Sequence, residues 1–141
     1  MKSSGGQEQS IAIRDADSPA WSVRAAAGRR LAISARVDEV ADVLHRLLLD
    51  QDTAVTQETA VALLARKDIV GLRCVLLARS YAAETSTAEE IQAALDCYPD
   101  WMTAEGADRL IKQLRKLTSD DDPGVRDEAQ RILASLLQRE E

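Results

Sequence analysis

The chain has 141 residues, of which 45% are hydrophobic and 30% charged, and its formal net charge is −6. This length fits one domain whose core needs neither metals nor disulfides, and the composition is that of a globular protein. The acidic balance argues against a protein whose main task is to grip phosphate backbones, because such binding depends on clustered positive charge.

The first part of the chain, residues 1–16, is polar and rich in small residues, and we expect a mostly disordered tail there. It lacks the apolar stretch of a secretory signal, and no apolar run approaches the roughly 20 residues that cross a bilayer. Cys74 and Cys97 then fit reduced thiols. These features predict a cytoplasmic protein without a membrane segment, and the Arg- and Ala-rich composition suggests a bacterial source.

From Ser18 onward, apolar residues recur at helical spacing, and no segment alternates as a strand does. Capping residues divide this part into about seven helices joined by short connections, which makes sequential helices antiparallel neighbours. The expected helices are residues 18–33, 36–49, 52–66, 68–81, 88–98, 103–117 and 122–137. Asp52, Asp68 and Asp122 introduce three of them, Thr103 or Asp100 caps another, and residues 86–90 offer two overlapping capping boxes.

An internal similarity links three of these helices. Val23-Arg24 is followed by Ala27 and Leu31, and Val125-Arg126 is followed by Ala129 and Leu133 at the same steps. Val55 begins the same steps without the arginine. The valines lie 32 and then 70 residues apart, and 70 is two periods of 35, which leaves one degenerate unit over residues 88–117.

On these residues the chain resembles the HEAT and HEAT-like (phycocyanobilin-lyase-type) repeat family, whose phrase of an acidic residue, Pro, Val-Arg, Ala and Leu appears in full at residues 121–133. The resemblance implies an all-α fold, an α-α superhelix of three to four repeats forming one domain over residues 17–141. In such a repeat the valine packs inward and the arginine bonds carboxylates or carbonyl groups of the inter-repeat turn. We therefore interpret the Val-Arg arginines as structural.

In such arrays the second helix of each pair usually lines a concave binding surface. The residues that we expect to bind a partner are Arg73, Arg79, Lys112 and Arg115, with His45 and Trp101 as further candidates. Trp101, like Trp21, is either a core residue or an interaction anchor, with core packing favoured. A plain mixed solvated surface is an equal alternative to a docking groove.

Catalytic and metal-binding patterns are missing from the sequence. One histidine and two distant cysteines do not supply a metal site, and Asp120-Asp121-Asp122 lacks the spacing of a calcium loop. There is no nucleophile motif and no Gly-rich phosphate loop. We expect no cofactor and no enzymatic activity.

The sequence thus predicts a non-catalytic protein–protein interaction module, an adaptor, regulatory protein or inhibitor that holds a protein partner, as a monomer or weak homo-oligomer. A nucleic-acid partner is disfavoured by the charge. The alternative is a HEAT-like enzyme of the DNA glycosylase or bilin lyase type, which would need a basic cleft.

Overall fold

The computed structural model describes residues 3–34 and 36–139, and these residues are all-α, with eight α-helices, two short 3-10 helices and no strand. The elements are α1 (Ser3–Asp15), α2 (Trp21–Ala32), η1 (Val37–Val40), α3 (Ala41–Leu48), α4 (Thr53–Leu64), α5 (Ile69–Tyr81), α6 (Thr85–Asp96), η2 (Pro99–Met102), α7 (Ala104–Leu117) and α8 (Pro123–Arg139).

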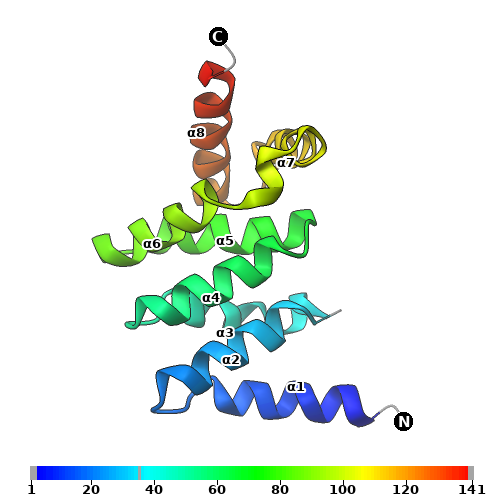
Figure 1. The fold of residues 1–141 in the computed structure, drawn as a ribbon, viewed down its shortest axis with the longest axis vertical. Coiled ribbons are helices and arrows are strands. Elements are labelled where there is room, and N and C mark those ends of the chain that lie inside the picture. Colours follow the sequence, from blue (N-terminus) through cyan, green and yellow to red (C-terminus); the bar gives the residue numbers. More distant parts are fainter. Residues whose placement is uncertain (1–2, 35, 140–141) are drawn as a thin grey trace.

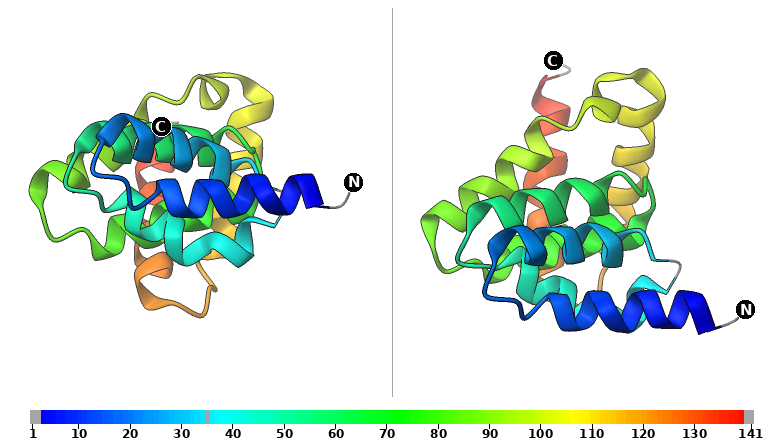
Figure 2. Two further views of the ribbon diagram at one scale, coloured as in Figure 1. Left: turned by 90° about the horizontal axis from the view of Figure 1, so that it is seen from below. Right: turned by 60° about the horizontal axis from the view of Figure 1, so that its bottom comes forward.

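The helices are stacked along the long axis of the molecule (Figure 1). Helices α2, α4 and α6 are neighbours in one row, and α3 and α5 pack against each other and against this row. Helix α1 lies beneath α2 at one end. At the other end α8 stands along the long axis, across the direction of α5, and packs on α5 and α7 (Figure 2).

Local capping explains where several helices begin. The side chain of Asp52 accepts a hydrogen bond from the backbone N–H of Ala54, and Asp68 accepts one from Gly71. Asp122 and Thr103 do the same at α8 and α7. These bonds satisfy N–H groups that have no partner within the helix. The predicted caps Asp52, Asp68 and Asp122 are confirmed, and Thr103, rather than Asp100, caps α7.

The core is one cluster of Leu, Val, Ile and Ala side chains that runs through the stack. Its centre contains buried residues of α2, α3, α4, α5 and α7, including Leu31, Leu44, Leu63, Leu76 and Leu114. With so few aromatic residues, the helices must approach closely to exclude water. The closest approach described joins α2 and α4 at Gly28, which lies against the side chain of Thr59.

Two boundaries differ from the sequence predictions. Residues 3–15 form helix α1 instead of a mostly disordered tail, because Ala12 and Ala16 are buried against the rest of the core. Helix α6 begins at Thr85 and not within the capping boxes, and Thr87 is buried inside it. No helix in the described part of the chain is long and apolar enough to cross a membrane.

Candidate binding surface

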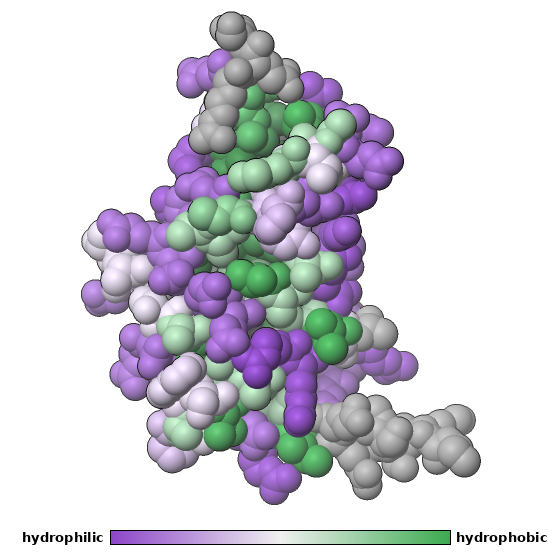
Figure 3. All heavy atoms as spheres, in the orientation of Figure 1, coloured by the Kyte–Doolittle hydropathy of each residue, from purple (hydrophilic) through white to green (hydrophobic). Residues whose placement is uncertain are grey.

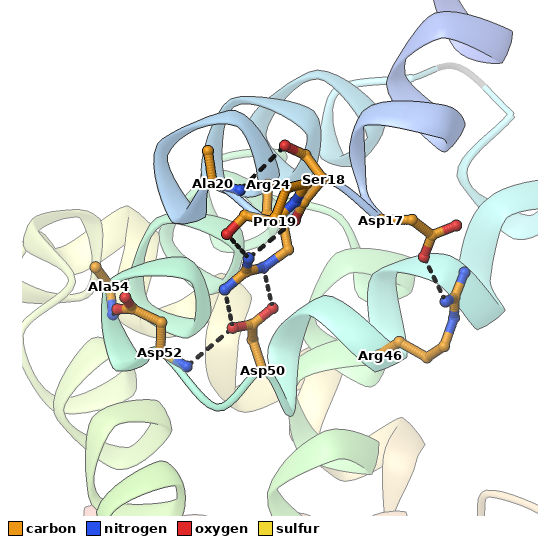
Figure 4. Close-up of polar contacts among 9 residues, drawn as sticks. All are labelled: Asp17, Ser18, Pro19, Ala20, Arg24, Arg46, Asp50, Asp52 and Ala54. Carbon is orange, nitrogen blue, oxygen red and sulfur yellow. Dashed lines mark hydrogen bonds and ion pairs between the residues drawn. The ribbon is translucent and has the colours of Figure 1, made fainter.

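The arginine of the first Val-Arg pair, Arg24, joins two turns of the chain (Figure 4). Its Nη1 atom donates to the carbonyl oxygens of Ser18 (2.9 Å) and Pro19 (3.2 Å), in the turn before its own helix. Its Nε and Nη2 atoms donate to the Asp50 carboxylate at 2.8 and 3.0 Å, and Asp50 also accepts from the backbone N–H of Asp52 at 2.9 Å. The structural interpretation of Arg24 is therefore confirmed.

The turn before α8 has the same construction. The Nη1 atom of Arg126 donates to the carbonyl oxygens of Asp120 (2.7 Å) and Asp121 (3.2 Å), and the N–H of Asp122 donates to the Asp120 carboxylate at 3.0 Å. Here the arginine that binds the carboxylate is Arg73 of α5, at 2.8 and 3.0 Å. These hydrogen bonds hold the pKa of the Asp120 carboxyl below its usual value of 3.8, although partial desolvation opposes them.

The two arginines of α5 that we expected to bind a partner are both directed to α8. Arg73 forms the bidentate pair with Asp120, and the Nη1 atom of Arg79 lies 3.7 Å from the Glu128 carboxylate. Glu128 is also 2.7 Å from Arg131 of its own helix. Arg73 and Arg79 therefore connect α5 to the last helix, and their charges are compensated within the chain.

Lys112 and Arg115 lie elsewhere, on the exposed side of α7. Leu110 and Leu114 cover the opposite, buried side of this helix. Lys116 is exposed beside them, and residues at positions i, i+3 and i+4 share a helix face. In the described residues none of these three cations forms an ion pair, and no contact joins them to Arg73 or Arg79. The predicted set thus divides into an internal pair and an exposed pair, and the sequence analysis omitted Lys116.

The aromatic candidates are partly buried. Trp101 packs against the core, and its ring meets that of Tyr98 edge-on at 5.4 Å between centroids. The His45 ring meets the exposed ring of Tyr81 edge-on at 5.5 Å, and its Nδ1 atom is buried without a hydrogen-bond partner among the described residues. Trp21, in contrast, is 49% exposed. The core interpretation fits Trp101 better than Trp21.

Apolar side chains are scattered over the surface. The face seen in Figure 3 carries small apolar areas separated by polar side chains, with no single broad apolar area. Within residues 3–34 and 36–139, no three His, Cys, Asp or Glu side chains are grouped as metal ligands. Cys74 and Cys97 are free thiols, and burial raises the pKa of Cys74.

Comparison with models of protein families, with curated proteins and with solved structures finds no match to this chain.

Proposed function

We propose that the chain is a short HEAT-like helical array that binds a protein partner and catalyses no reaction. The spacing of its elements supports the array. Helices α2, α4 and α6 each have 12 residues, begin 32 residues apart at Trp21, Thr53 and Thr85, and lie side by side. The same turn construction before α4 and α8 supports a common origin of these units.

The distribution of uncompensated positive charge is the observation that carries the binding proposal. Ten of the arginines and lysines whose side chains are described form ion pairs, and Arg126 binds carbonyl oxygens. Those left without such a partner are Arg14, Arg30, Lys112, Arg115 and Lys116. Three of these five share the outer face of α7. This α7 face is therefore the surface that we assign to an acidic segment of a partner protein.

A protein partner fits this face better than a nucleic acid does. Phosphate-backbone binding rests on many cations, and here three cations stand on a chain with a net charge of −6. Opposite charges at a protein interface, in contrast, increase the association rate and select the partner even when few groups take part.

The test uses a partner isolated with the full chain from the native source, identified, and purified. The variant Lys112→Glu/Arg115→Glu should weaken binding roughly tenfold or more by calorimetry. The control Arg14→Glu/Arg30→Glu changes the net charge equally, at two other exposed and uncompensated cations, and should change the affinity by about twofold at most. Both variants should keep the helical circular dichroism, because exposed charges contribute little to stability. Equal effects of the two variants would show that only overall charge matters and would refute the α7 face.

A further inference from the structure

Arg24 and Arg126 are the fourth residues of α2 and α8, and both anchor their Nη1 atom on carbonyl oxygens six and five residues earlier in the chain. The remaining Nε and Nη2 atoms of Arg24 bind Asp50, which lies in the turn that leads α4, the next helix of the row. The Nε and Nη2 atoms of Arg126 have no acceptor among the described residues. Arg126 is therefore held in the orientation of Arg24 but has no carboxylate to bind.

The side of α8 that follows Arg126 is also uncovered. In α2, the residues at the eighth, eleventh and twelfth positions are Gly28, Leu31 and Ala32, and all three are buried in the stack. The same positions of α8 hold Gln130, Leu133 and Ala134, of which Leu133 is half-buried and the other two are exposed. The row thus continues beyond α2 but does not continue beyond α8.

We propose that Arg126 and this uncovered side of α8 bind a helix of a partner protein, and that the turn leading this helix supplies an aspartate to the Nε and Nη2 atoms of Arg126. The contact repeats in trans the one that Arg24 makes with Asp50. Bidentate arginine–carboxylate pairs are specific in geometry, and the anchored Nη1 atom reduces the entropy lost on binding. This inference rests on the proposed function and specifies the partner's contact.

A second copy of the chain does not supply the required aspartate. Asp50 and Asp120 already accept from Arg24 and Arg73, and their side chains are only 9% and 13% exposed. In the turn before α2 the corresponding residue is Ser18, whose hydroxyl accepts from the N–H of Ala20 as Asp50 accepts from Asp52. The occupant is therefore a different polypeptide.

The experiment places a photo-crosslinking amino acid at Gln130 of the full chain, with the exposed Gln57 of α4 as control position. A protein crosslinked from Gln130 and not from Gln57 in extracts of the native source is identified and purified. Arg126→Lys keeps one donor for the carbonyl oxygens but loses the paired Nε and Nη2 donors, so it should keep the melting temperature and weaken binding roughly tenfold or more. Asparagine in place of the partner's aspartate should weaken binding equally, and the two changes together should add little further loss.

A second variant tests the surface without touching the arginine. Ala134→Arg is at an exposed position and should block the partner helix while leaving stability unchanged. The inference is overturned if Gln130 captures no protein, if Arg126→Lys and Ala134→Arg both bind as the parent does, or if the two aspartate and arginine changes are additive. A partner that depends on Lys112 and Arg115 but not on Arg126 would support the proposed function and refute this inference.

Discussion

The contact between Gly28 of α2 and Thr59 of α4 allows a sharp test of the packing. A Cβ atom at Gly28 would lie far inside the contact distance of Thr59 Oγ1, and at 3.2 Å from Thr59 Cβ. Thr59 is fully buried, and its branched side chain has few ways to move aside. Overpacking of this kind costs about 1–3 kcal/mol, whereas alanine in a helix is favoured over glycine by about 1 kcal/mol. Gly28→Ala should therefore destabilise the fold by about 1–2 kcal/mol.

This loss should appear as a fall in melting temperature of roughly 4–8 °C, followed by circular dichroism, and as a lower urea midpoint at unchanged slope. In a Thr59→Ala background the obstructing atoms are gone, and Gly28→Ala should become neutral or stabilising by up to about 1 kcal/mol. A Thr59→Val background keeps the bulk and removes only the hydroxyl, so the loss should persist. If Gly28→Ala is harmless in the parent, or equally harmful in all three backgrounds, the helices are not in the contact described.

Three further predictions concern the buried valine, the arginine of the first turn and the acidic limit of stability. Val125 is fully buried as the third residue of α8, so Val125→Asp should lower the free energy of unfolding by about 3 kcal/mol or more, whereas Val23→Asp at the third, 36% exposed position of α2 should cost less than about 1 kcal/mol in the same urea titration. Arg24→Ala removes the hydrogen bonds between two turns and should cost about 2–3 kcal/mol in urea unfolding, and equal stability of variant and parent would refute that role. The lowered pKa of Asp120 beside Arg73 gives stability that is present above the ordinary carboxyl pKa and is lost as pH falls through the lowered value, so Asp120→Asn should flatten the stability profile of the parent between about pH 5 and pH 2.

The sequence predicted those parts of the fold that depend on neighbouring residues. Asp52, Asp68 and Asp122 could be identified as caps because an N-cap needs only a short acceptor and the N–H groups that follow it. Arg24 could be assigned to the turns because its acceptors lie a few residues before it and at the next cap. The valines at positions 23, 55 and 125 were placed correctly in register, since each is the third residue of its helix.

Other features depend on contacts between distant segments. Helix α1 is composed of weakly apolar residues, and it was missed because the burial of Ala12 and Ala16 requires the rest of the stack. Arg73 and Arg79 resemble surface cations in sequence, and only the position of α8 across α5 brings Asp120 and Glu128 to them. The even period of 35 was also an average, because the helix starts are separated by 32, 32 and then 38 residues.

The position of α8 has a consequence for how the molecule unfolds. In a simple linear array each unit contacts only its neighbours, so the last unit can fray while the others remain folded. Here α8 is joined to the middle of the stack through contacts that span long stretches of sequence, such as the 47 residues between Arg73 and Asp120. Detaching α8 therefore removes the acidic partners of two arginines on α5 and uncovers part of the central layer, which makes loss of the C-terminal helix a cooperative event for the whole protein.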